Sequence, residues 1–294
     1  MTDQILTVLG GTGFLGSFIV NTLVEAGYSV RIACRRPDRG TRPESDRVDR
    51  VVCDLRDEGS LRRALKGSAA MINAVGLYEE KHGLTFDRIH VDGAQAAARC
   101  ALDMGVERQI LISGIGASTA STSKYVRARA KGEDAVREIF GNTTILRPST
   151  LCSRHQGFVN ALEMITRFPV IPLFGRGTTR LQPVYAGDVA AAVRRCIEMP
   201  EAAGRTFELG GGETYTYLEC VKLMLEQKGS QRPIIPLPFG CWHLLAAILS
   251  LLPKPPLNRD QVILMENDNI AGDNVGTFRD LGIEPLSLRA VIRG

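Results

Sequence analysis

Residues 4–34 read QILTVLGGTGFLGSFIVNTLVEAGYSVRIAC, and this stretch decides the fold. An apolar strand leads into glycines at a three-residue step, Gly10, Gly13 and Gly16. A helical pattern then runs to Gly27, and a second apolar strand follows. A strand, a helix and a strand within about thirty residues form a βαβ unit, in which such glycines make a tight turn, admit a pyrophosphate and let helix and strand pack closely. The alternative is a glycine-rich turn that holds no ligand.

The alternation of apolar strands and helical patterns continues beyond this unit. Strand candidates lie near residues 4–9, 30–34, 48–53, 69–74, 109–113 and 143–147. Such alternation is typical of a parallel sheet with helices on both faces. We therefore predict an α/β protein: a Rossmann-type doubly wound parallel sheet in residues 1–150, and a smaller C-terminal α/β lobe in residues 151–294 that is interleaved with the first domain.

Composition bounds the class of protein. The chain has 294 residues, 44% apolar and 23% charged, which is ordinary for a globular protein. Its net charge of +4 comes from scattered Lys and Arg, so we expect no nucleic-acid partner. The N-terminus lacks a secretory signal and there is no apolar run of about 18 residues, so we expect a cytoplasmic protein without a membrane span. The seven cysteines show no CxxC pair, which predicts reduced thiols.

The residues after the second strand indicate which dinucleotide binds. An NAD site usually has Asp or Glu about 20 residues after the glycines, whereas a 2′-phosphate requires cations. Arg35 and Arg36 occupy that position, and guanidinium groups form paired hydrogen bonds to phosphate, so we predict NADP(H). Asp54, at the end of the third strand, is expected to accept from the adenine amine, and residues 74–76 to line the ribose. The alternative is that both arginines are solvated surface residues.

Several short motifs occur in an order typical of one large family. GGTGFLG, CDLRD, NAVG and LISGIGAS, followed by a tyrosine, resemble the extended and atypical short-chain dehydrogenases/reductases. The segments RLQPVYAGDVAAAV, FELGGGETYTYLE and LPKPPLNRDQVILMENDN resemble one branch, the nucleotide-binding accessory subunits of respiratory complex I (NADH:ubiquinone oxidoreductase) and their bacterial relatives. The resemblance covers nearly the whole chain. It implies a nucleotide-binding protein that associates with a membrane redox complex.

The resemblance also assigns catalytic positions. In active family members Tyr acts as acid or base, Ser orients the carbonyl, and a Lys four residues after the Tyr holds the nicotinamide ribose and lowers the Tyr pKa. Ser113 and Tyr125 match, but Arg129 stands where the lysine is expected. Lys131 does not replace that lysine, because two further helical steps turn it about 200° away. The altered motif predicts weak or absent catalysis, and the alternative for Tyr125 is an ordinary packed tyrosine.

The predicted dinucleotide contacts combine the glycine turn, the ends of the following strands and the altered catalytic residues. They are Gly10, Thr12, Gly13, Phe14, Leu15, Gly16, Arg35, Arg36, Asp54, Leu55, Ala74, Val75, Gly76, Tyr125, Arg129 and Pro148. We expect no metal site, because His82, His90, His155 and His243 show no metal-ligand spacing. Asp188 in VYAGDVA is expected to cap a helix before the second lobe.

Residues 241–252 form an apolar run inside PLPFGCWHLLAAILSLLPKPP. A helix of about twelve residues is roughly 18 Å long, too short for a hydrocarbon core of about 30 Å. The run is either a helix buried in the second lobe or a docking face. Trp242 and Lys254 suit an interfacial position, so we predict contact with a membrane surface or a membrane-complex subunit, at the inner face of the membrane.

Two interpretations of the function remain open at this point. The first is an NADPH-holding, catalytically weak accessory subunit or assembly factor of a membrane redox complex. The second is an active NADPH-dependent reductase, epimerase or dehydratase that acts on a small or lipid-like substrate, such as a quinone precursor. A third, a regulator that senses the cofactor ratio, has little positive support in the sequence.

Overall fold

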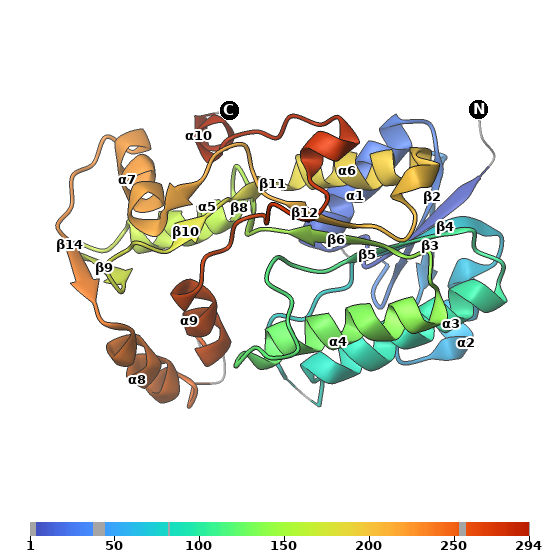
Figure 1. Ribbon diagram of the computed structural model, residues 1–294, viewed down its shortest axis with the longest axis horizontal. Coiled ribbons are helices and arrows are strands. Elements are labelled where there is room, and N and C mark those ends of the chain that lie inside the picture. The colour runs from blue at the N-terminus through green and yellow to red at the C-terminus, as the bar shows by residue number, and fades with distance from the viewer. Residues whose placement is uncertain (1–3, 38–44, 82, 253–256, 294) are drawn as a thin grey trace.

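A seven-stranded sheet forms the centre of the protein (Figure 1). The computed structural model describes residues 4–37, 45–81, 83–252 and 257–293. In the order along the sheet, the strands are β12 (Thr206–Leu209), β6 (Thr144–Pro148), β5 (Arg108–Ile112), β4 (Ser68–Asn73), β1 (Ile5–Leu9), β2 (Ser29–Cys34) and β3 (Val48–Val52). Every neighbouring pair is parallel, and the chain order reverses between β1 and β4. The predicted doubly wound Rossmann-type fold is confirmed.

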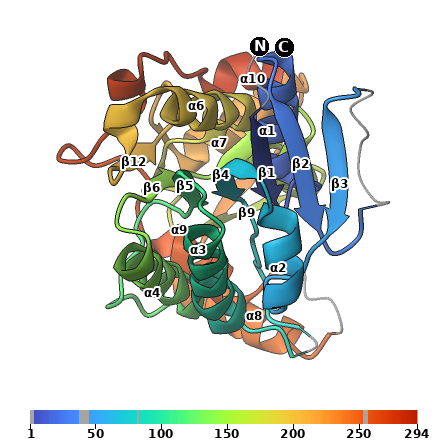
Figure 2. The ribbon, with the colours of Figure 1, turned by 90° about the vertical axis from the view of Figure 1, so that its right-hand side faces the viewer.

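Helices cover both faces of this sheet. One face carries α1 (Phe14–Glu25) and α6 (Ala186–Glu198), and the other carries α2 (Glu58–Leu65), the π-helical turn η1 (Asp87–Asp92), α3 (Gly93–Asp103) and α4 (Lys124–Ile139) (Figure 2). Successive side chains of a strand point to opposite faces, so Val8 packs in the core under α1 while Leu9 packs in the core under α3. Burial on both faces explains why the central strands β1 and β4 are mostly apolar, whereas the edge strand β3 contains Asp49 and Arg50.

The remaining elements build a smaller lobe with an apolar core of its own. They are β7 (Leu151–Ser153), β8 (Gln156–Gly157), α5 (Phe158–Ile165), β9 (Ile171–Phe174), β10 (Arg180–Leu181), β11 (Val184–Tyr185), β13 (Tyr215–Thr216), α7 (Tyr217–Gln227), β14 (Ile234–Leu237), α8 (Phe239–Leu249), α9 (Arg259–Glu266) and α10 (Leu288–Arg293). Two short 3₁₀ turns, η2 (Pro200–Ala202) and η3 (Phe278–Leu281), instead pack beside α6 in the core of the large sheet. The two proline-punctuated segments pair as the parallel strands β9 and β14. α6 packs on the large sheet, and β12 is its edge strand beside β6. The predicted domain boundary near residue 150 stays a prediction.

The apolar run of residues 241–252 forms most of α8, which has one buried and one exposed face. Trp242 is 7% exposed, donates from Nε1 to the Leu173 carbonyl at 2.9 Å, and stacks on Phe174. Trp242 is therefore a core residue, and its predicted interfacial position is wrong. The exposed large apolar side chains of the run are Leu244, Leu245, Ile248, Leu251 and Leu252. Lys254 lies outside the described residues, and no described helix is long and apolar enough to cross a membrane.

Asp188 differs from its prediction as a helix cap. α6 begins at Ala186, with Tyr185 at the N-cap position, so Asp188 lies inside the first turn. Its carboxylate accepts the backbone N–H of Leu286 at 2.8 Å, and burial raises its pKa. The residue therefore fastens the C-terminal segment to α6 instead of capping the helix.

Candidate functional site

The turn between β1 and α1 forms a tight cradle in which Gly10 and Gly16 leave no room for a side chain. Gly10 has a φ of +79°, and its carbonyl accepts the N–H of Gly13 at 2.9 Å. A Cβ atom at Gly16 would lie 2.2 Å from that carbonyl oxygen, so only glycine fits there. α1 begins at Phe14 without a side-chain cap, which leaves its first N–H groups available. Such N–H groups at a helix N-terminus suit a pyrophosphate.

The cradle lies where the strand order reverses. β1 and β4 are neighbours, and a Cβ atom at Gly10 would lie 3.1 Å from the backbone nitrogen of Val75, just beyond β4. Nucleotides bind doubly wound sheets at this carboxyl edge and at this reversal point. Residues 74–76 therefore lie where a ribose is expected. Of the other predicted contacts, Thr12 and Phe14 are half-buried, whereas Leu15, Leu55 and Pro148 are buried.

A cluster of charges lies at the same edge, beyond β2 and β3. Arg35 and Arg36 directly follow β2, and both side chains are exposed. Arg56 donates to Asp54 from Nε at 2.9 Å and from Nη2 at 2.6 Å. These hydrogen bonds, together with the charge of Arg35, hold the pKa of Asp54 below its usual value. The sequence prediction missed Arg56, a third cation at this edge, although it stands two residues after Asp54.

Ser113, Tyr125 and Arg129 belong to one cluster. Ser113 follows β5, while Tyr125 and Arg129 lie one turn apart on α4. The Arg129 guanidinium carbon lies 5.2 Å from the centroid of the Tyr125 ring, and Nη1 donates to the Ile112 carbonyl at 2.6 Å. Lys131 is exposed and stays outside the cluster, as the helix geometry predicted. The arginine is therefore packed against the tyrosine and held by the end of β5.

Two buried polar atoms of this cluster lack a hydrogen-bond partner among the described residues. Within the described part of the chain, neither Ser113 Oγ nor Arg129 Nε has a hydrogen-bond partner. Both residues line a cavity of about 10 Å³, roughly the space of one water molecule. An unpaired buried polar group is costly, so such atoms commonly mark a place where a ligand or water binds. A hydroxyl and a guanidinium can donate hydrogen bonds to the oxygen atoms of a nucleotide or to a carbonyl oxygen.

Aromatic rings surround Tyr125. The rings of Tyr78, Phe86 and His90 lie 5.8, 5.5 and 5.7 Å from its centroid. His90 belongs to η1, which packs so closely on α4 that a Cβ atom at Gly132 would lie 1.9 Å from the His90 carbonyl oxygen. π-Helical turns frequently occur at functional sites. The sequence prediction treated His90 as an ordinary residue and did not name Tyr78.

His90 is held in its neutral form. The residue is 6% exposed, and its Nε2 lies 3.0 Å from the Leu77 carbonyl oxygen. Burial lowers the pKa of His90 to about 3, and the nearby charge of Arg129 acts in the same direction. A neutral imidazole beside Arg129 avoids placing a second buried positive charge in the cluster.

His90→Gln is expected to make folding less sensitive to acid. The unfolded histidine has a pKa near 6.5 and the folded one about 3, so the unfolded state binds one more proton between these values. The free energy of unfolding therefore falls as the pH falls through this window, by at most about 1.4 kcal/mol per pH unit. Urea unfolding at about pH 7 and about pH 5 measures the effect, with exposed His155→Gln as the control. Equal pH dependence in wild type and both variants would contradict it.

A buried chain of charges lies one helical turn beyond Arg129. Glu133 is 1% exposed and accepts from Arg147 Nε at 2.9 Å and Nη2 at 2.6 Å. Arg147 Nη1 lies 3.2 Å from Oε1 of Glu208, whose Oε2 accepts the Gly272 N–H at 2.9 Å. This series of ion pairs connects α4 to β6 and β12. The sequence prediction missed it, although Glu133 follows Arg129 by four residues and thus shares its helix face.

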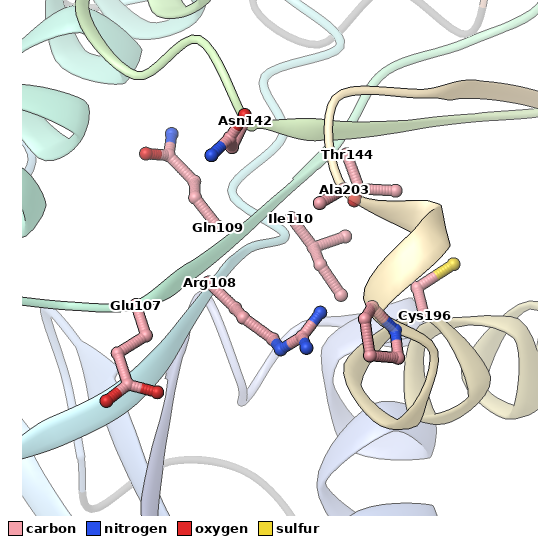
Figure 3. A pocket seen from close by; sticks show the side chains of 9 residues that line it. Glu107, Arg108, Gln109, Ile110, Asn142, Thr144, Cys196 and Ala203 are labelled. Carbon is pink, nitrogen blue, oxygen red and sulfur yellow. The ribbon is translucent and has the colours of Figure 1, made fainter.

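A second cavity lies at the opposite edge of the sheet (Figure 3). Its volume is about 230 Å³, and it is lined by Glu107, Arg108, Gln109, Ile110, Asn142, Thr144, Cys196, Pro200 and Ala203. Arg108 and Thr144 begin β5 and β6, so the cavity lies at the amino ends of the strands. The Gln109 side chain is buried, and its amide has no partner among the described residues. None of the predicted site residues lines this cavity, so it is separate from the nucleotide edge.

The four histidines of the chain do not gather at one site in the described structure. His155 is exposed, and His243 Nε2 lies 2.9 Å from Glu266 Oε1, whereas His82 lies outside the described residues. Across the described ranges, no three His, Cys, Asp or Glu side chains form a group that could hold a metal ion.

The fold and the site define a Rossmann-type, NAD(P)-binding protein of the short-chain dehydrogenase/reductase kind. This assignment rests on three features: the strand order, the glycine cradle, and the cluster of Ser113, Tyr125 and Arg129. The chain belongs to the NAD dependent epimerase/dehydratase family, whose model matches residues 6–210.

Individual relatives agree with the family. The chain is 31% identical over 302 residues to the mitochondrial NADH dehydrogenase (ubiquinone) 1 alpha subcomplex subunit 9 of Arabidopsis thaliana, covering 97% of this chain and 75% of the relative. It is 29% identical over 235 residues to ceramide reductase of Caulobacter vibrioides, covering 80% and 74%. The NADPH complex of an NADPH-dependent quinone oxidoreductase from Escherichia coli matches with a TM-score of 0.79 at 18% identity, covering 98% of each chain, and supports the fold alone. The resemblance read from the motifs is confirmed.

Proposed function

We propose that this protein holds NADP(H) with weak or no catalysis and serves as an accessory or assembly factor of a complex I-like membrane redox complex. The observation that carries the proposal is Arg129, buried where the active motif requires lysine. Its guanidinium is engaged by the Ile112 carbonyl and the Tyr125 ring, so it does not offer the compact, adaptable ammonium group of a lysine. The likeness to a complex I subunit supports the accessory role.

The site residues fit each part of NADP(H). The glycine cradle and the N-terminus of α1 would hold the pyrophosphate. Arg35 and Arg36 would hold the 2′-phosphate, and Asp54 keeps lone pairs for the adenine amine beside its bonds to Arg56. Tyr125 and Arg129 would face the nicotinamide ribose. The bound cofactor would supply hydride, while these side chains only position it.

Arg35→Ala combined with Arg36→Ala is expected to weaken NADPH binding about 10- to 150-fold, because removing charge-assisted contacts to phosphate costs about 1.5 to 3 kcal/mol. NADH binding should change little, since NADH lacks the 2′-phosphate. Calorimetric titration of both cofactors measures the effect, and the nucleotide that co-purifies with the wild type gives an independent check. The exposed Arg232→Ala serves as the matched control. Equal affinity of the wild type for NADPH and NADH would refute the cofactor assignment.

The exposed face of α8 supports contact with a membrane surface. Leu244 and Ile248 are 64% and 57% exposed and lie one turn apart, while Trp242 and Ala246 anchor the other face in the lobe. A helix anchored on one side with apolar side chains on the other suits the interface of a bilayer. The net charge of +4 favours an anionic surface. The expected location is the cytoplasm, at the inner face of the membrane.

Leu244→Asp combined with Ile248→Asp is expected to weaken partition onto anionic vesicles at least about tenfold, because each exposed leucine-sized side chain gains about 1.5 to 3 kcal/mol on burial. Thermal stability should be retained, since neither side chain is in the core. Vesicle sedimentation measures the partition, and Leu102→Asp on α3, which removes a 55% exposed leucine elsewhere, is the control. A wild type that never binds vesicles would count against the docking role.

One observation favours a second candidate, an NADPH-dependent reductase of a lipid-like carbonyl. Ser113 Oγ is buried without a partner within the described part of the chain, in the position expected to orient a carbonyl. The similarity to ceramide reductase supports a lipid-like substrate. NADPH oxidation by the wild type with long-chain ketones, lost in Ser113→Ala and Tyr125→Phe, would favour this candidate over the accessory role.

A further inference from the structure

α9 lies between α8 and the N-terminal start of α4 (Figure 1). Val262 of α9 is fully buried and packs with Trp242 and Ala246 of α8. His243 and Glu266 add a polar contact between the same two helices at 2.9 Å. Because tightly packed side chains transmit displacement, we expect α8 and α9 to move together.

The other end of this helix pair reaches the nucleotide site. Oδ1 of Asp260, in the first turn of α9, accepts from Ser123 Oγ at 2.5 Å and lies 3.5 Å from the backbone nitrogen of Tyr125. Ser123 is fully buried and is the N-cap of α4, the helix that carries Tyr125 and Arg129. A carboxylate at a helix N-terminus is stabilised by the free N–H groups and the helix dipole. Asp260 therefore holds the start of α4 from the second lobe.

A second contact ties the segment after α9 to the same edge of the sheet. Asn269 Oδ1 accepts from Ser149 Oγ at 2.5 Å and from the Thr150 N–H at 3.1 Å. Both partners directly follow Pro148, one of the predicted nucleotide contacts. The segment from α9 to Asn269 thus touches two separate parts of the nucleotide edge.

We propose that Asp260 is a positioning residue of the nucleotide site, and that through it NADP(H) binding and contact of α8 with a membrane surface strengthen each other. This inference rests on the proposed function. A membrane that orders α8 also orders α9 and, through Asp260, the helix start that presents Tyr125 and Arg129. The nucleotide then meets an ordered site and binds more tightly. The effect is reciprocal, because linkage requires the same factor in both directions.

The test uses the full-length protein, NADPH, and vesicles of phosphatidylglycerol and phosphatidylcholine in equal parts. The NADPH dissociation constant is measured with and without vesicles, and the vesicle partition with and without saturating NADPH. We expect both quantities to change by the same factor, about fivefold or more. If each ligand binds alone but neither affects the other, the inference is overturned while the proposed function stands. If NADPH or vesicles fail to bind at all, the proposed function fails, and this inference with it.

Asp260→Ala is expected to bring the linkage factor close to one while both separate binding events remain. The matched control is Glu226→Ala, which removes an exposed carboxylate of α7 that pairs with Arg289 inside the second lobe. The control should keep the wild-type factor. A purely structural role of Asp260 would lower thermal stability and leave the factor unchanged, and that result would overturn the proposal. Ser123→Ala, which removes the hydroxyl that donates to Asp260, gives the same comparison if the alanine variant of Asp260 fails to fold.

Discussion

Glu133→Ala is expected to lower the free energy of unfolding by about 3 kcal/mol, because it leaves the Arg147 guanidinium without its buried partner. Losing one member of a buried ion pair commonly costs about 3 to 5 kcal/mol. The lower end applies, since Arg147 keeps Glu208 at 3.2 Å and its side chain is 20% exposed. The variant also leaves Arg129 without the nearby carboxylate.

Urea denaturation measures this loss. Glu138→Ala is the matched control, because Glu138 is an exposed glutamate of the same helix and its removal should cost little. Glu133→Gln keeps the shape without the charge, so its stability should lie between the wild type and the alanine variant. If Glu133→Ala loses no more stability than Glu138→Ala, the buried chain does not stabilise α4 as argued.

Arg129→Lys is expected to raise the rate of NADPH oxidation by a carbonyl or quinone substrate about a hundredfold, since acid–base catalysis by a positioned group contributes about 10²- to 10⁴-fold. The shorter lysine would release the Ile112 carbonyl and offer an ammonium group at the position that the active motif uses. Tyr125 would then have the partner that the family motif provides.

The measurement is NADPH absorbance against a panel of ketones, aldehydes and quinones. Arg127→Lys is the control, because Arg127 lies on the same helix, is half-buried and donates to the Ser121 carbonyl away from the cluster. It should leave the rate unchanged. Rapid turnover by the wild type with any substrate of the panel would contradict the accessory role and support the reductase candidate.

The local part of the fold was predictable because it depends on neighbours in the sequence. The turn at Gly10, Gly13 and Gly16 joins a strand and a helix that are adjacent in the chain, and the apolar pattern of β1 reports its burial on both faces. The strand order, with its reversal between β1 and β4, follows from the few topologies that βαβ units allow. The position of the nucleotide edge follows from the same rule.

The amphipathic character of α8 was only half predictable. Its sequence is apolar on nearly every side, so the pattern contains no signal for which face is buried. Packing in the second lobe determines the buried face, because Phe174 and the Leu173 carbonyl lie where the Trp242 ring can stack and its Nε1 can donate. The outer leucines were left exposed by the same packing.

By itself, the sequence determined the family, the doubly wound sheet, the glycine cradle and the substitution of Arg129 for lysine, since each is written in residues close together in the chain. The tertiary structure alone decided which polar groups meet. Glu133 and Arg147 are 14 positions apart, and Ser123 and Asp260 are 137 apart. The strength of a charge pair depends on burial and distance, and both are set only when distant segments pack together. No local pattern encodes them, so the buried charges behind α4 and the Asp260 contact became visible only in the fold.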